Sequence, residues 1–279
     1  MRMENLVRKL FRKKLFNKKI LIFGNSGFCG SWLSLTLTFF GAKILGISTK
    51  MANPLYLSNT IQFKKNIKTL NCDLIRLNKV KVDIIKFKPD IVIHLASQPI
   101  VKVGFLNPYK TYETNIIGTL KIFEILRAIP TIKKILVFTS DKVYRNSEKK
   151  ILIETSAMGG GQDPYSASKS SQDIISQSYG YSFFNKTKMI IIRSGNIIGG
   201  GDWAKDRLIP DIIRSYSNNK IFKVRSLNST RPWIHILDVI NAILLALTEN
   251  GTKNNSNLIF NLSSKKIAQV SVKKIIKLI

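Results

Sequence analysis

The sequence has few cysteines and few acidic residues. Two cysteines, Cys29 and Cys72, occur in 279 residues. Two thiols exclude a disulfide framework, and a chain of this length buries a core without one. A reducing compartment, the cytoplasm, is therefore expected. Acidic side chains number 16 against 45 Lys and Arg, which gives a net charge of +29.

Lysine supplies most of the basic excess. There are 34 Lys and 11 Arg, together with 41 Ile and 22 Asn. Lys, Ile and Asn share A/T-rich codons, so the base composition of the gene accounts for the excess without a polyanionic partner. Arg is the better ligand for phosphates and bases, and it is the scarcer cation. We therefore expect no nucleic-acid partner, and we keep a nucleic-acid-binding module as an alternative.

No apolar run reaches the roughly 20 residues that a membrane-spanning helix needs. The longest, around residues 32–47, is interrupted by Gly41 and Lys43. The first 19 residues carry eight cations and one acid, and the apolar run at 20–23 that follows is too short for a signal peptide. We expect a solvated basic helix at the start, with a membrane-surface helix as the alternative, and no integral membrane segment.

Short apolar runs alternate with helical patterns over the first 190 residues. This alternation predicts βαβ units and a parallel sheet with helices on both faces, an α/β fold. The pattern loosens after residue 193. Strands are expected at 19–23, 43–47, 67–72, 91–95, 134–139, 188–193, 221–225 and 258–262, and helices at 28–40, 80–87, 109–129, 165–181, 207–217 and 237–249.

A glycine-rich turn follows the first predicted strand. Gly24, Gly27 and Gly30 form a G-x-x-G-x-x-G pattern between that strand and an apolar helix. Such glycines let the backbone turn sharply and approach a pyrophosphate, and the helix N-terminus offers it free N–H groups. The pattern predicts dinucleotide binding in a Rossmann-type doubly wound sheet. The second strand ends at residues 48–50, Ser-Thr-Lys, with no acid for a ribose hydroxyl, so NAD and NADP both stay open.

Two sets of polar residues are candidates for catalysis: one directly follows the fifth predicted strand, and the other lies at the start of the next predicted helix. Tyr165 and Lys169 are four residues apart, so they share one helix face, and the ammonium is expected to lower the pKa of the phenol and make it a base. Ser140, Asp141 and Lys142 stand at the strand edge where open α/β sheets bind ligands. A carboxylate and an amine at that edge are more than hydride transfer requires.

With these motifs the sequence resembles the extended short-chain dehydrogenases/reductases, the superfamily of nucleotide-sugar epimerases and dehydratases. The segments at 27–34, 94–99, 195–203 and 231–235 are similar to those of the CDP-glucose 4,6-dehydratases. The resemblance extends from about residue 19 to the C-terminus. Related dehydratases carry Asp-Glu at the position of Asp141 and Lys142, and epimerases lack the acid there.

The resemblance implies a redox-neutral reaction with NAD that converts CDP-glucose to CDP-4-keto-6-deoxyglucose, in deoxysugar and O-antigen polysaccharide biosynthesis. Tyr165, helped by Ser140 and Lys169, would remove the proton of the sugar 4-hydroxyl. Lys142 would then remove the proton at C5, and Asp141 would protonate the departing 6-hydroxyl. No metal is implied.

The resemblance also assigns binding residues and a dimer of identical chains. For the sugar nucleotide they are Asn196, Arg207 and Arg231. For the cofactor they are Gly24, Ser26, Gly27, Phe28, Gly30, Asp73, Leu74, Ala96, Gln98, Asn115, Tyr165 and Lys169.

The end of the chain departs from this pattern. Residues 270–279 are expected to form a strand that turns into an apolar helix, and similar proteins continue past this point. We therefore expect a dinucleotide-binding domain over residues 1–193 and an incomplete, mixed α/β substrate-binding portion over 194–279. An epimerase or reductase of the same superfamily, and a catalytically impaired NAD-binding remnant, stay as alternatives.

Overall fold

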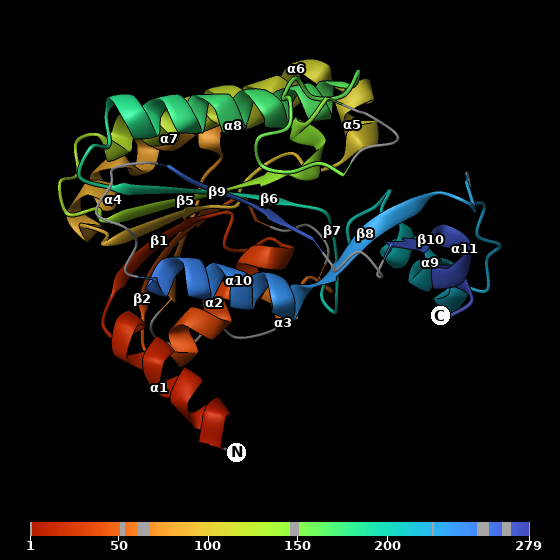
Figure 1. The fold of residues 1–279 in the computed structure, drawn as a ribbon, viewed down its shortest axis with the longest axis horizontal. Coiled ribbons are helices and arrows are strands. Elements are labelled where there is room, and N and C mark those ends of the chain that lie inside the picture. The colour runs from red at the N-terminus through yellow and green to blue at the C-terminus, as the bar shows by residue number, and fades with distance from the viewer. Residues whose placement is uncertain are drawn as a thin grey trace.

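A seven-stranded parallel sheet forms the centre of the larger layer (Figure 1). The computed structural model describes residues 2–50, 54–60, 67–145, 151–224, 226–249, 257–263 and 269–278. The strand order is β3-β2-β1-β4-β5-β6-β9, and every neighbouring pair is parallel. The strands are β1 (Lys19–Phe23), β2 (Lys43–Ser48), β3 (Ile67–Asn71), β4 (Ile91–His94), β5 (Lys134–Ser140), β6 (Lys188–Ser194) and β9 (Leu258–Leu262).

The sheet is covered by helices on both faces, which explains why its strands are apolar throughout. In β1, Ile20 and Ile22 face one cluster of buried side chains, and Leu21 and Phe23 face the other. Helices α1 (Arg2–Leu15), α2 (Phe28–Phe39) and α10 (Ile236–Thr248) cover the first face. The second is covered by η1 (Leu74–Val80), α4 (Lys81–Phe87), α7 (Gly118–Leu126) and α8 (Pro164–Ser182). The predicted doubly wound sheet is confirmed.

The N-terminal helix α1 packs on the fold along one face. Phe11 and Leu15, one helical turn apart, are buried, and the Phe11 ring meets that of Phe40 edge-on at 5.6 Å. Arg12 and Lys13 point to solvent. The expected helix is present. Its basic face is exposed to solvent as predicted, whereas its apolar face packs on the fold. Within the described part of the chain, no helix is long and apolar enough to cross a membrane.

The helix expected at residues 109–129 is interrupted in three dimensions. It divides into α6 (Pro108–Tyr112), a wider turn η2 (Glu113–Ile117) and α7. Turns of this kind bond i to i+5 and often lie at functional sites. Here the wide turn carries Asn115, which is fully buried. A short helix that the sequence does not predict, α5 (Val101–Leu106), precedes α6.

A second, mixed sheet lies at the carboxyl edge of the first. Its order is β10-β8-β7, with β8 antiparallel to β10 and parallel to β7. The prediction of a strand at 221–225 is wrong for residues 221–224, because they form no regular structure. Residue 225 lies outside the described residues. Ile221 is 92% exposed, whereas Ile234 of β8 is buried. The elements are β7 (Asn196–Ile198), β8 (Thr230–His235), β10 (Gln269–Ser271), α9 (Leu208–Ser217) and α11 (Val272–Ile276).

Candidate active site

A cavity of about 1390 Å³ opens between the two sheets, at the carboxyl ends of β1, β4, β5 and β6. The strand order reverses at β1, because β2 and β4 lie on its two sides. Open α/β sheets bind ligands at this kind of reversal. The cavity is lined by the larger sheet on one side and by residues 194–213 and the small sheet on the other.

The glycine turn after β1 lines the inner end of the cavity. Gly24 has φ of +86°, and a Cβ there would stand 2.7 Å from the Ala96 backbone nitrogen. A Cβ on Gly30 would overlap the Gly24 carbonyl oxygen, so α2 starts directly against the turn. Gly27 begins α2 and offers no capping side chain to its first N–H groups. The turn is therefore a cradle that side chains would fill, and it fits the pyrophosphate of a dinucleotide.

Most of the expected cofactor residues line the cavity, and three do not. Ser26, Gln98 and Asn115 are not among the lining residues, and their expected part in cofactor binding stays a prediction. Those that line it are Gly24, Gly27, Phe28, Gly30, Asp73, Leu74, Ala96, Tyr165 and Lys169.

Gln98 and Asn115 instead fix the backbone that follows β4. Asn115 Oδ1 accepts from the Gln98 N–H at 2.7 Å, and Asn115 Nδ2 donates to Ser168 Oγ at 2.8 Å. The Gln98 side chain donates to Thr111 Oγ1 at 2.9 Å and accepts from the Ile100 N–H at 2.6 Å. One buried amide thus joins the loop after β4 to α8, the helix that carries Tyr165 and Lys169.

Lys169 is held below the catalytic edge by two oxygen acceptors. Its ammonium donates to the Phe138 carbonyl at 3.2 Å and to Gln172 Oε1 at 2.7 Å. Gln172 is itself oriented by Thr119 Oγ1 at 3.1 Å and His94 Nε2 at 3.0 Å. Burial lowers the pKa of Lys169 to about 7, and that of His94 to about 3. His94 is therefore neutral, and Lys169 titrates near neutral pH.

The phenol of Tyr165 differs from the sequence-based expectation. Burial raises its pKa above the usual value of 10.0, and the Ser140 hydroxyl and Arg207 only partly oppose this. The lowering that Lys169 was expected to supply is not found, because the ammonium is turned toward Phe138 and Gln172. Positive charge and the Ser140 hydrogen bond remain the means of making Tyr165 a base.

Ser140, Asp141 and Lys142 stand together at the end of β5, on the cavity wall that also carries Tyr165. Ser140 Oγ donates to Asp141 Oδ1 at 3.1 Å and accepts the Lys142 N–H at 3.2 Å. Lys142 Nζ lies 3.9 Å from Asp141 Oδ2, and both side chains are partly open to the cavity. The expected cluster of hydroxyl, carboxylate, amine and phenol is therefore brought to one place.

A buried ion pair that the motifs do not predict supports this cluster. Arg193 donates through Nε to Asp173 Oδ2 at 2.9 Å and through a second nitrogen to Asp173 Oδ1 at 2.9 Å. Asp173 Oδ2 also accepts from Thr139, which precedes Ser140. Arg193 donates further to the Tyr144 hydroxyl at 2.9 Å. The pair therefore contacts the chain on both sides of the segment that carries Ser140 and Lys142.

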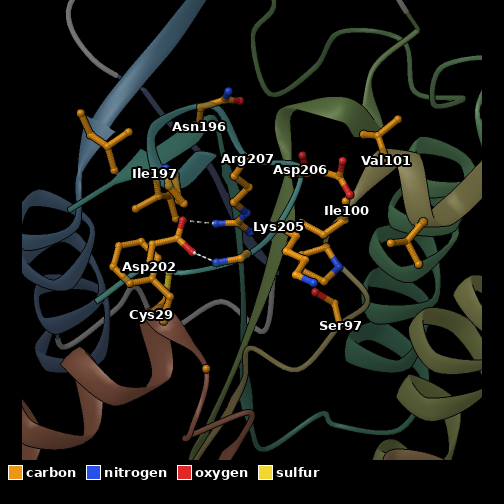
Figure 2. Close-up of a pocket in the computed structure, with 18 of the residues that line it drawn as sticks. Cys29, Ser97, Ile100, Val101, Asn196, Ile197, Asp202, Lys205, Asp206 and Arg207 are labelled. Atoms are coloured by element: carbon orange, nitrogen blue, oxygen red, sulfur yellow. Dashed lines mark hydrogen bonds and ion pairs between the residues drawn. The ribbon is translucent and has the colours of Figure 1, made fainter. Parts of the chain in front are cut away.

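The opposite wall of the cavity carries the residues expected to bind the sugar nucleotide. Arg207 and Asp202 point toward one another there, with Arg207 Nη1 3.0 Å from Asp202 Oδ2 (Figure 2). Asn196 and Arg231 also line the cavity. A contact of 2.8 Å between Lys102 of α5 and Asp206 joins this wall to the larger layer.

Some functional groups were not found from the sequence. His94, Thr119 and Gln172 orient Lys169, and the only local signal is the spacing of Gln172, three residues after Lys169. Asp202 pairs with Arg207 from within a glycine-rich loop. Burial raises the pKa of the Cys29 thiol to about 12, so it is no nucleophile at neutral pH. Among the described residues no cluster of His, Cys, Asp and Glu could hold a metal ion.

The fold and the site define a dinucleotide-binding enzyme of the short-chain dehydrogenase type. Residues 20–263 match the NAD dependent epimerase/dehydratase family, and the chain belongs to that family. The resemblance drawn from the motifs is confirmed, and NAD is the cofactor that the family uses.

Two relatives narrow the comparison. The chain is 37% identical over 235 residues to a CDP-glucose 4,6-dehydratase of Salmonella typhimurium. The aligned region covers 82% of this chain and 66% of that protein. It is 32% identical over 289 aligned positions to a dTDP-D-glucose 4,6-dehydratase of Dictyostelium discoideum. That alignment covers 92% of this chain and 63% of the relative. The chain thus spans slightly less than two thirds of the length of these curated relatives.

Solved structures share the fold at low sequence identity. An epimerase of Methanothermobacter thermautotrophicus has a TM-score of 0.86 at 20% identity, and covers 98% of this chain and 79% of its own. A dTDP-glucose 4,6-dehydratase of Streptomyces venezuelae, solved with NAD bound, has a TM-score of 0.80 at 17% identity, and covers 93% of this chain and 79% of its own. Both confirm the expected fold class.

Removing one partner of the buried pair should destabilise the protein strongly. Asp173→Ala leaves the Arg193 guanidinium buried without its carboxylate, and we expect the free energy of unfolding to fall by about 3–5 kcal/mol. Asp83→Ala is the control, since its pair with Lys68 spans 3.7 Å and is exposed, and should cost no more than about 1 kcal/mol. Urea unfolding measures both, and equal losses would contradict the assignment.

Stability should rise with pH through the titration of Lys169. Its folded pKa of about 7 lies below the usual 10.5, so between these values the unfolded chain binds the proton more tightly. The free energy of unfolding of the natural chain, relative to Lys169→Met, should therefore increase from about pH 7 to about pH 10, by at most about 1.4 kcal/mol per pH unit. Lys186→Met, on the surface, is the control. A difference that stays flat with pH would contradict the low pKa.

Proposed function

We propose that this protein is a nucleotide-sugar 4,6-dehydratase that converts CDP-glucose to CDP-4-keto-6-deoxyglucose. The carrying observation is that Asp141 and Lys142 stand on the same cavity wall as Tyr165, with a carboxylate and an amine 3.9 Å apart. An oxidation alone needs neither group, whereas loss of water needs an acid and a base. The 37% identity to a CDP-glucose 4,6-dehydratase supports the substrate.

The turn after β1 and the ends of β2, β3 and β4 would hold the cofactor. Gly24, Gly27 and Gly30 leave room for the pyrophosphate, and the N-terminus of α2 attracts its charge. Asp73 and Ala96 line the cavity farther along. When bound, NAD supplies the hydride chemistry at C4 and C6 of the sugar and a positive charge that favours the phenolate.

The first proton transfer belongs to Tyr165. As the phenolate, Tyr165 takes the proton of the sugar 4-hydroxyl and becomes the phenol. Ser140, whose hydroxyl donates to Asp141 in the free site, would turn that hydrogen to the phenolate and stabilise it. Lys169 lies below them with a pKa of about 7, so at neutral pH it exchanges protons readily. The resulting 4-ketone acidifies the proton on the adjacent C5.

The loss of water belongs to the pair after β5. A proton that passes from the Lys142 ammonium to the Asp141 carboxylate frees the amine to take the C5 proton. The carboxyl of Asp141 gives its proton to the C6 hydroxyl, which leaves as water, and the proton that Tyr165 took from the sugar restores the pair at the end of the cycle. The carbon–oxygen bond at C6 breaks as the C5–C6 double bond forms, and Lys142 then returns its proton to C5. The 3.9 Å separation of the two groups lets them serve adjacent carbons.

The small sheet and the segment before α9 are proposed to bind the nucleotide. Arg207 and Arg231 are suited to the diphosphate, because guanidinium groups bind its oxygens in pairs. Asn196 also lines the cavity. In this proposal residues 1–193 with α10 and β9 hold the cofactor, and most of 194–279 holds the substrate. The product class feeds deoxysugar synthesis, including that of O-antigen polysaccharides.

We also propose a homodimer in the cytoplasm. Large apolar side chains are exposed on the outer helices of the upper layer in Figure 1, where a second copy would cover them: Leu106, Tyr109, Tyr112, Ile117 and Ile174. The free thiols of Cys29 and Cys72 fit a reducing compartment.

Substitutions at the acid and base should stop water loss and spare the cofactor. Asp141→Asn and Lys142→Met should each lower the rate of product formation by about 10²–10⁴-fold, the usual contribution of a general acid or base, with NAD affinity unchanged. Lys133→Met, exposed at the other end of β5, should react at the normal rate. The assay mixes protein, NAD+ and a panel of CDP-, dTDP-, GDP- and UDP-hexoses, and detects the 4-keto-6-deoxy sugar by its absorbance in alkali.

Three results would contradict the proposal. Normal turnover of either variant would remove Asp141 or Lys142 from the mechanism. A product that keeps its 6-hydroxyl would favour an epimerase or reductase. Bound NAD without any product from any sugar would favour a catalytically impaired remnant.

A further inference from the structure

We propose that the adenosine end of the cavity accepts a 2′-phosphate, so that this chain binds NADP with an affinity close to that for NAD. The inference rests on the proposed cofactor site and concerns the part of it farthest from the chemistry. It is carried by the charges at the ends of β2 and β3.

No carboxylate is available where an NAD-specific site holds the ribose. In this fold an acid after the second strand binds the ribose hydroxyls, and it repels a phosphate at the same position. The sequence contains no Asp or Glu from residue 5 to residue 72, a stretch that includes β1, β2 and β3 and every segment between them. Ser48 and Thr49 line the cavity where the acid would stand.

The first acid after this stretch is already engaged. Asp73 accepts the Ile75 N–H at 3.0 Å, which caps η1, and it lies 3.5 Å from the ammonium of Lys110. A carboxylate that accepts a backbone N–H and pairs with a cation repels an approaching anion less than a free carboxylate does. Asp73 is therefore a weaker barrier to phosphate than the missing acid would be.

Three cations lie near the same end of the cavity without lining it. Lys50 is exposed directly after Thr49, and its backbone N–H is fixed by Asn71 Oδ1 at 3.2 Å. Arg76 and Lys79 of η1 act electrostatically on Cys72, which lines the cavity between β3 and Asp73. Two hydroxyls and these cations provide hydrogen-bond donors and a favourable field for a dianion.

The test measures binding directly and needs no turnover. Protein freed of bound nucleotide is titrated calorimetrically with NAD+ and with NADP+ at low and high salt. We expect the two dissociation constants to agree within about tenfold, and NADP+ binding to weaken more than NAD+ binding as salt rises. A preference for NAD+ greater than tenfold would overturn the inference. Failure to bind both nucleotides would overturn the proposed cofactor site itself.

Variants identify the residues that set the preference. Thr49→Asp should restore discrimination, weakening NADP+ relative to NAD+ by at least about tenfold, whereas Thr49→Asn, of the same size without the charge, should not. Lys50→Gln should weaken NADP+ selectively, and Lys43→Gln, at the opposite end of β2, should leave both constants unchanged. Unchanged ratios in both Thr49→Asp and Lys50→Gln would contradict the assignment to this end of the cavity.

Discussion

The buried ion pair between Arg193 and Asp173 connects the elements on which the site depends. Arg193 is the penultimate residue of β6, Asp173 lies on α8, and Thr139, which bonds to the pair, is one residue before Ser140. Tyr144, on the far side of the catalytic segment, bonds to the same guanidinium. A charge pair this deep is costly unless every group finds partners, and here both carboxylate oxygens and all three guanidinium nitrogens are bonded. The fixed geometry of Ser140, Asp141 and Lys142 follows from it.

A second buried network of hydrogen bonds holds Lys169. Lys169, Gln172, His94 and Thr119 form a connected set beneath Tyr165, and Asn115 extends it to the loop after β4. Both networks pass through α8. One helix thus carries the tyrosine, the lysine that titrates near neutral pH and the carboxylate that orders the end of β5. This arrangement would let the proposed oxidation and loss of water take place in one small volume.

The cofactor layer could largely be predicted from the sequence, because its determinants are local. Apolar runs set the parallel strands within one residue, and Gly24, Gly27 and Gly30 set the turn. The position of the candidate catalytic residues at one edge could also be predicted, since the ends of parallel strands meet there. The predictions that failed concern features that depend on contacts between residues far apart in the sequence. Helical periodicity does not separate an i+5 turn from an i+4 turn, so the wide turn that buries Asn115 was missed.

The pKa values of the site residues were harder to predict from the sequence than the places of these residues in the fold. The lowered pKa expected for Tyr165 assumed that spacing decides where the Lys169 ammonium points, and the ammonium instead finds the Phe138 carbonyl and Gln172. The β8 strand contains Pro232 and pairs with segments far away in sequence, so no local pattern indicated it. The net charge of +29 reflects the excess of lysine, and such a positive field would favour the encounter with the diphosphates of the proposed cofactor and substrate.

The most direct measurement follows the hydrogen at C4 of the sugar. CDP-glucose deuterated at C4 is incubated with the protein and NAD+, and the product is analysed by mass spectrometry and NMR. The proposed mechanism predicts a product that has lost one water and carries the deuterium at C6. A product that keeps its 6-hydroxyl, or one that has lost water without deuterium at C6, would contradict it.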